Sequence, residues 1–174
     1  MPDRTLAETR FLRLLDRDGW TFVERPNSKG VVLIVPLTAE RKLLFVEQFR
    51  APLGRKAIEF PAGLIGDEPG HEREAPVASA RRELVEETGY EARDLELVAT
   101  TSTSPGMTNE LVHFVLAWNL ARVGKGGGVA GESIVVHEVP IGEARAWLAE
   151  REREGHVVAA KVYAGLYFAN ERWK

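Results

Sequence analysis

The chain contains no cysteine at all. This absence excludes disulfide frameworks, thiolate nucleophiles and zinc or iron–sulfur sites built on cysteine. Hydrophobic runs are short, and none reaches the length of about 18 uncharged apolar residues that a membrane-spanning helix needs. The polar start, Met1–Arg4, leads into no apolar run of the signal-peptide type. We therefore expect a soluble, cytoplasmic protein without a membrane partner.

The chain also lacks an excess of charge of one sign. Lys and Arg number 23 and Asp and Glu number 26, which gives a net charge of −3. A balance of this kind gives no reason to expect binding to nucleic acid, which needs a clearly basic surface. The composition excludes these classes but does not by itself indicate an activity.

The remaining composition is that of one globular domain. The 174 residues are 44% hydrophobic and 28% charged, an ordinary balance for a packed core with a charged surface. The β-branched run Val31–Val35 predicts a strand covered on both faces, and Pro76 and Gly89 are typical of the start and the end of a helix. The expected strands are 31–35, 42–49, 57–60, 95–101, 111–118 and 134–139, and the expected helices are 76–88, 141–154 and a segment around 163–170. Mixed strands and helices predict the α/β class.

The first 30 residues are expected to form an extension of antiparallel strands before a main domain at 31–174. Two short apolar runs, 11–15 and 20–23, flank Asp18-Gly19, and such a dipeptide favours the tight turn of a hairpin. A helix over 5–15, capped by Thr5 and Glu8, is the alternative.

The expected central helix carries a cluster of carboxylates. Glu83 and Glu87 are four residues apart and share one face, and Glu86 lies beside them. Such a cluster suits a hard divalent cation, Mg²⁺ or Mn²⁺, because these ions prefer oxygen ligands. The alternative is a solvated acidic face in which Arg82 pairs with Glu86.

The surroundings of this cluster favour the metal site. In chain order the residues are Gly63, Glu74, Arg82-Glu83-Leu84, Glu86-Glu87 and Gly89-Tyr90. This order and most of its spacing resemble the signature of the Nudix hydrolases. The one departure is that ten residues separate Gly63 from Glu74 where the family pattern has five, so the loop carries an insertion of five. Glu74 is the glutamate at the family's distance from Arg82.

Two further stretches resemble the ADP-ribose pyrophosphatases of that family. Residues 59–63 match their Glu-x-Pro-Ala-Gly sequence, and Ser104-Pro105-Gly106 matches a Ser-Pro-Gly motif, with Pro105 sixteen residues after Gly89. The resemblance implies a Nudix-type α/β/α sandwich with a mixed sheet. It also implies metal-dependent hydrolysis of a nucleoside diphosphate sugar, foremost ADP-ribose to AMP and ribose 5-phosphate. Other nucleotide sugars (GDP-mannose, UDP-glucose), a dinucleoside polyphosphate, or binding of a nucleotide sugar without catalysis remain alternatives.

The resemblance also assigns roles to individual residues. It implies Glu83, Glu86 and Glu87 and the backbone carbonyl of Ala62 as ligands of Mg²⁺ or Mn²⁺, and an ion pair between Arg82 and Glu74. The expected catalytic residues are Glu132, as a general base on a glycine-rich loop, Glu86 and Glu110. The expected substrate-binding residues are Arg50, Arg55, Glu59, Pro105, Gly106 and Met107.

The N-terminal strands are expected to serve assembly and recognition of the base. Relatives form dimers that exchange such strands, so we expect a homodimer. Trp20 or Phe22 could stack on the base, although packing in the core is an equally good interpretation. The four histidines show no spacing typical of a metal site.

Overall fold

The computed structural model describes residues 3–67, 70–129 and 133–173. The strands are β1 Arg4–Glu8, β2 Arg13–Arg17, β3 Trp20–Glu24, β4 Val31–Pro36, β5 Lys42–Arg50, β6 Arg55–Glu59, β7 Ala62–Leu64, β8 Tyr90–Ser102, β9 Leu111–Arg122, β10 Val135–Pro140 and β11 Val157–Val158. The helices are α1 Pro76–Thr88, α2 Ala144–Arg153 and α3 Ala160–Arg172, with short 3₁₀ turns at Ala51–Leu53 and Ile141–Glu143.

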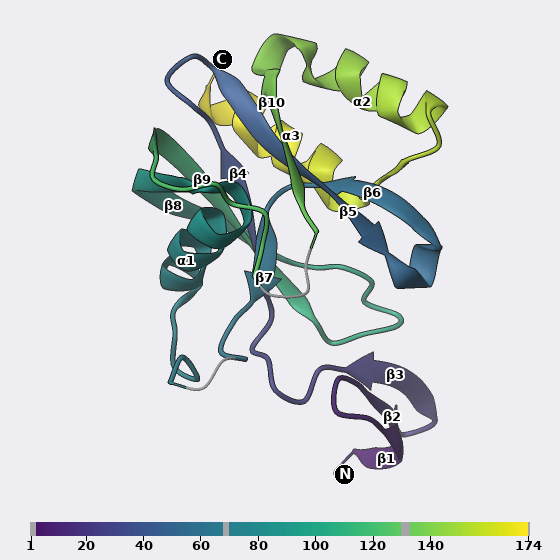
Figure 1. Cartoon of the computed structure of the whole chain (residues 1–174). Helices are drawn as coiled ribbons and strands as arrows, with labels where there is room; N and C mark the ends of the chain where they lie inside the picture. Colours follow the sequence, from purple (N-terminus) through teal and green to yellow (C-terminus); the bar gives the residue numbers. More distant parts are fainter. Residues whose placement is uncertain (1–2, 68–69, 130–132, 174) are drawn as a thin grey trace.

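Two four-stranded sheets form the body of the molecule (Figure 1). One has the order β10-β5-β6-β11 and the other the order β7-β4-β9-β8. Both are mixed, because β6 pairs with β11 and β4 pairs with β9 in parallel, while the other neighbours are antiparallel. The expected mixed sheet is therefore divided into two.

Strand β4 lies at the centre of the packing. Its side chains alternate between two hydrophobic clusters: Val31, Leu33 and Val35 belong to the larger one, and Val32 and Ile34 to the smaller. The larger cluster includes side chains of α2 and α3, and the smaller one lies beneath α1. Helices thus cover the strands on both sides, which confirms the α/β/α sandwich and explains why this strand is apolar at every position.

Helix α1 has the ends that its sequence predicts. It begins at Pro76, where the missing N–H of proline costs nothing, and Gly89 follows it with a φ of 73°. Its buried side chains, among them Ala80 and Leu84, pack on the sheet that contains β4 and β7. The carboxylates of Glu83 and Glu87 lie along this packed side of α1, where the helix contacts β7.

The N-terminal residues form a small antiparallel sheet of their own, β1-β2-β3, at the edge of the molecule (Figure 1). Asp18 and Gly19, with φ of 52° and 86°, make the turn between β2 and β3. The hairpin is thereby confirmed and the alternative helix over 5–15 is wrong. Backbone contacts from β3 to the 105–110 loop, such as the 2.8 Å hydrogen bond from Val23 N–H to the Met107 carbonyl, attach this sheet to the body.

The remaining differences from the expected elements concern short or polar strands. Strands β7 and β11 have three and two residues and were not expected, and β8 begins at Tyr90 rather than 95. The helix expected over 141–154 begins as a 3₁₀ turn. In the part of the chain that the structure describes, no helix is long and apolar enough to cross a membrane.

Candidate active site

Strand β7 and helix α1 bring the predicted metal ligands together. Gly63 in β7 lies directly against the carboxyl group of Glu83, and a Cβ atom at this position would overlap it. The neighbouring Ala62 donates its backbone N–H to Oε2 of Glu87 at 3.2 Å. The short strand therefore positions the face of α1 that carries the carboxylates.

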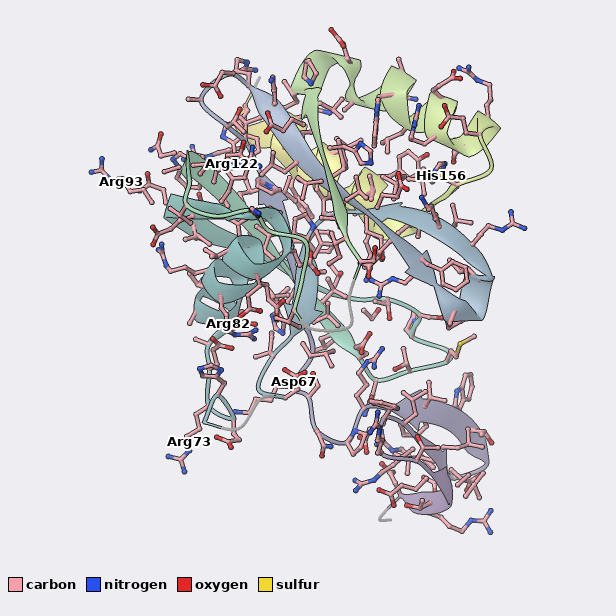
Figure 2. All side chains as sticks on the ribbon, viewed as in Figure 1. Asp67, Arg73, Arg82, Arg93, Arg122 and His156 are labelled. Atoms are coloured by element: carbon pink, nitrogen blue, oxygen red, sulfur yellow. The ribbon has the colours of Figure 1, made fainter. Side chains whose placement is uncertain are left out.

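Arg82 pairs with carboxylates on both sides of it. Its guanidinium lies 2.8 Å from Glu83, 3.1 Å from Glu86 and 3.4 Å from Glu74. The contact with Glu74 is the one that the motif spacing predicts, and it fixes the end of the inserted loop to α1. Figure 2 shows Arg82 on α1 with Asp67 on the loop near the same end of the helix.

The charge of this cluster is not fully compensated. Burial and the nearby charge of Glu86 raise the pKa of the Glu83 carboxyl to about 7, although the Arg82 guanidinium lowers it. Asp67 adds a smaller repulsion. A buried carboxylate held among other carboxylates is a group that a divalent cation would stabilise in its ionised form.

The cluster opens into a cleft with a volume of about 620 Å³. Acidic and basic side chains both line it. The acidic residues are Glu59, Asp67, Glu83, Glu86, Glu87 and Glu110, and the basic residues are Arg25, Arg50, Arg82 and Lys161. The basic residues come from β5, α1, α3 and the segment after β3, so the cleft is built from parts far apart in the sequence.

Two of the arginines that line the cleft are paired with its glutamates. Arg50 binds Glu59 through both Nε and Nη2 at 2.6 Å, and the Glu59 side chain is only 11% exposed. Arg25 lies 2.8 Å from Glu110. Guanidinium forks of this kind also match phosphate oxygens, so the same arginines could turn to a phosphate ligand.

The structure gathers seven of the predicted site residues in this one cleft. They are Arg50, Glu59, Ala62, Glu83, Glu86, Glu87 and Glu110. Glu132 lies outside the described residues, and no histidine that the structure describes lines the cleft; His156, for example, lies near the end of α2 (Figure 2).

Four predicted substrate-binding residues do not line the cleft. Arg55 is exposed at the start of β6. Pro105 lines a separate hollow of about 240 Å³ that also contains Trp20 and Phe22. Gly106 accepts a hydrogen bond from the Trp20 indole at 3.2 Å, and the Met107 side chain is 63% exposed.

Sequence reasoning missed Arg25, Lys161 and Asp67. Arg25 follows the last N-terminal strand, and Lys161 precedes an expected helix, so neither lies near the recognised motif. Asp67 lies in the inserted loop, where the family pattern gives no guide. Strand pairing between distant parts of the chain brings Arg25 and Lys161 to the cleft.

The donor set fits a hard divalent cation. Carboxylate oxygens and the Ala62 carbonyl are the ligands that Mg²⁺ or Mn²⁺ prefers, and the cluster offers no sulfur donor. Among the described residues no three acidic or histidine side chains already converge in a metal-binding arrangement. Arg82 holds Glu83 and Glu86, so these side chains must turn away from it to ligate a metal.

Comparison with known proteins assigns the chain that forms this cleft to a family. The model of the NUDIX domain matches residues 28–160, which is most of the chain. The chain is 36% identical over 140 residues to the methanol dehydrogenase activator of Bacillus methanolicus, covering 74% of this chain and 73% of that protein. It is 42% identical over 109 residues to the ADP-ribose pyrophosphatase of Bacillus subtilis (strain 168), covering 57% of this chain and 56% of that protein.

Further relatives come from other organisms and carry other activity names. The ADP-sugar pyrophosphatase of Mus musculus is 35% identical over 162 residues, covering 83% of this chain and 71% of that protein. Several bacterial GDP-mannose pyrophosphatases are 30 to 38% identical. A solved structure of an ADP compounds hydrolase has the same fold, with a TM-score of 0.75 over 98% of this chain and 91% of that chain at 21% identity. This chain therefore belongs to the Nudix family and is a Nudix hydrolase.

Proposed function

We propose that the chain hydrolyses the diphosphate linkage of a nucleoside diphosphate sugar, with ADP-ribose as the preferred substrate and AMP and ribose 5-phosphate as products. The observation that carries the proposal is the single cleft in which the α1 carboxylates lie together with Arg50 and Lys161. A diphosphate is densely negative, so a site for it needs metal ions on its acidic part and cations on the rest. Relatives named ADP-ribose and ADP-sugar pyrophosphatase support this choice of substrate.

We infer that Glu83, Glu86, Glu87 and the carbonyl of Ala62 hold Mg²⁺ or Mn²⁺. When bound, such an ion polarises a phosphoryl group and makes a water molecule more acidic. The protein's own part is to keep these oxygens close: Gly63 leaves room for the Glu83 carboxyl group, and Arg82 fixes the loop through Glu74.

Arg50 is the proposed phosphate-binding arginine. Its ion pair with Oε2 of Glu59, made through Nε and Nη2, holds the guanidinium at the cleft wall before substrate arrives. Arg55, which is exposed outside the cleft, stays a prediction without such support.

The general base remains assigned to Glu132, which lies outside the described residues. Glu110 lines the cleft, but its carboxylate is engaged by the Arg25 guanidinium at 2.8 Å and is not free to contact a water molecule. We assign Glu110 to positioning Arg25 at the cleft.

The N-terminal sheet is the proposed dimerisation element of a cytoplasmic homodimer. Leu6, Phe11, Leu12 and Trp20 are 42–63% exposed on this small sheet or its turns. Large apolar side chains gathered on so few residues favour an interface, and a second copy of the chain would cover them.

A change of substrate to GDP-mannose is the second candidate, because several relatives carry that name. The test is a panel of ADP-ribose, GDP-mannose, UDP-glucose and a dinucleoside polyphosphate with Mg²⁺, in which kcat/KM is measured by release of the nucleoside monophosphate. We expect ADP-ribose to have the highest kcat/KM. Much faster cleavage of GDP-mannose would reassign the substrate, and hydrolysis of none would favour a binding protein.

A further inference from the structure

Among the described residues, Lys161 is the basic residue of the cleft that has no acidic partner. Arg25, Arg50 and Arg82 each form an ion pair with a cleft carboxylate. Lys161 lines the same cleft and is half-buried, yet within residues 3–67, 70–129 and 133–173 no carboxylate pairs with it. A lysine held in an acidic cleft without a partner is available to an anionic ligand.

The position of Lys161 follows from the pairing of a two-residue strand. Val157 and Val158 of β11 pair in parallel with Ala57 and Ile58 of β6, and the N–H of Ala159 donates to the carbonyl of Ile58 at 3.1 Å. The chain then enters α3, with Lys161 as the second residue of the helix. Because Glu59 directly follows Ile58, Lys161 lies on the part of the cleft wall that carries the pair of Arg50 and Glu59.

The charge of Lys161 is unfavourable for the stability of α3. The N-terminal end of a helix carries a partial positive charge, so a cation in the first turn is unfavourable and an acidic residue is preferred. The first turn of α3 contains no acidic residue, and no side chain caps this end. A lysine at this position therefore has an electrostatic cost that a bound anion would offset.

We propose that Lys161 is a substrate-binding residue that contacts the phosphate oxygens of the diphosphate group. The inference rests on the proposed function and extends it by adding a cation to the phosphate site. Lys161 and Arg50 form the basic wall of the cleft, and the carboxylates of α1 form the acidic part. Lys161 binds the charge of the diphosphate as a point charge, whereas Arg50 supplies a planar fork.

The test compares Lys161→Gln, Lys161→Arg and the control Lys42→Gln. Lys42 is a surface lysine paired with Glu138 at 3.3 Å outside the cleft, and such pairs contribute little to stability. For Lys161→Gln we expect the KM for ADP-ribose to rise about tenfold or more with a much smaller change in kcat, since one charge-assisted hydrogen bond is lost. Lys161→Arg should restore most of the affinity, and Lys42→Gln should behave as the wild type.

A second measurement separates this inference from the proposed function. The dissociation constant of α,β-methylene-ADP, a diphosphate that cannot be hydrolysed at its methylene bridge, is measured by calorimetry with Mg²⁺. We expect about tenfold weaker binding by Lys161→Gln, with a Tm equal to or above that of the wild type. If Lys161→Gln binds the analogue more weakly but the wild type hydrolyses no nucleotide sugar, the proposed function alone is refuted. Unchanged KM and unchanged binding, or a lowered Tm without rescue by arginine, would overturn the role of Lys161.

Discussion

At the scale of single residues, the glycine in β7 decides whether the carboxylates of α1 can assemble. Gly63 has an ordinary backbone conformation, so its importance comes from space and not from a special φ. The Glu83 carboxyl group occupies the place that a side chain would fill. The motif glycine is thus explained by close approach of a strand to a helix.

This contact predicts the effect of Gly63→Ala. The added methyl must push Glu83 out of the cluster, so we expect affinity for Mg²⁺ to fall about tenfold or more and the free energy of unfolding to drop by about 1–3 kcal/mol. The matched control is Gly142→Ala, because a Cβ at Gly142 meets no atom within 4 Å. Metal titration by calorimetry and urea unfolding measure both quantities. Wild-type affinity in Gly63→Ala would contradict the assignment of Glu83 as a ligand.

The raised pKa of Glu83 predicts a pH-dependent stability of the metal-free protein. Burial raises this pKa from the ordinary 4.5 to about 7. The folded state therefore favours the protonated carboxyl, and its contribution to stability is present below pH 4.5 and is lost as the pH rises through 7. In EDTA, Glu83→Gln should have a Tm about 2 °C or more above the wild type at pH 8, and the difference should vanish near pH 4.5.

Thermal unfolding scans from pH 4.5 to 8 check this prediction. Saturating Mg²⁺ at pH 8 serves as the internal control. Metal binding to the native state should raise the Tm of the wild type, which keeps the Glu83 carboxylate, more than that of Glu83→Gln. A Glu83→Gln variant less stable than the wild type in EDTA at pH 8 would show that Glu83 is not strained by its surroundings.

At the scale of elements, local patterns predict α1 and β4, but not the short strands. The repeat of Ala80, Leu84 and Glu87, with Pro76 and Gly89 at the ends, defines α1 without any other part of the chain. Strands β7 and β11 have too few residues for any periodicity, and they exist only because β4 and β6 offer them partners. Since β7 carries Ala62 and Gly63 and β11 leads to Lys161, the elements that complete the site are those with the weakest signal.

The β1-β2-β3 sheet predicts the outcome of removing residues 1–24. Neither hydrophobic cluster of the body contains a residue of these strands, so the remaining chain should fold. We expect light scattering after size-exclusion chromatography to give a dimer for the full chain and a monomer for the truncated one. We also expect a higher KM if the partner's strands contribute to binding the base. A truncated chain that stays dimeric would place the interface elsewhere.

At the scale of the whole molecule, the balanced composition conceals a local separation of charge. The net charge of −3 favours no polyanionic ligand. The fold nevertheless gathers six acidic and four basic side chains around one cleft. We propose that this local arrangement of charges binds a phosphate-rich substrate, and the net charge gives no information about such an arrangement.

Local periodicity and motif spacing predicted the α/β class and the carboxylates of α1, and the family resemblance implied the α/β/α sandwich. The sequence did not predict the division into two sheets, or the arrival of Arg25 and Lys161 at the cleft, because these depend on strand pairing over more than 80 residues. Arg55 and Pro105 show the opposite case, in which nearness in sequence does not bring a residue to the cleft. They are close in sequence to site residues, but the structure places them outside the cleft.

The central claim is that the cleft hydrolyses ADP-ribose with the α1 carboxylates and a divalent metal. The most direct test follows ADP-ribose by ³¹P NMR with the full chain in Mg²⁺, with EDTA and the Glu87→Gln variant as controls. We predict AMP and ribose 5-phosphate in equal amounts, no turnover in EDTA, and a loss of about 100-fold or more in the variant. Unchanged ADP-ribose in Mg²⁺, or the same rate in EDTA or in Glu87→Gln, would contradict the claim.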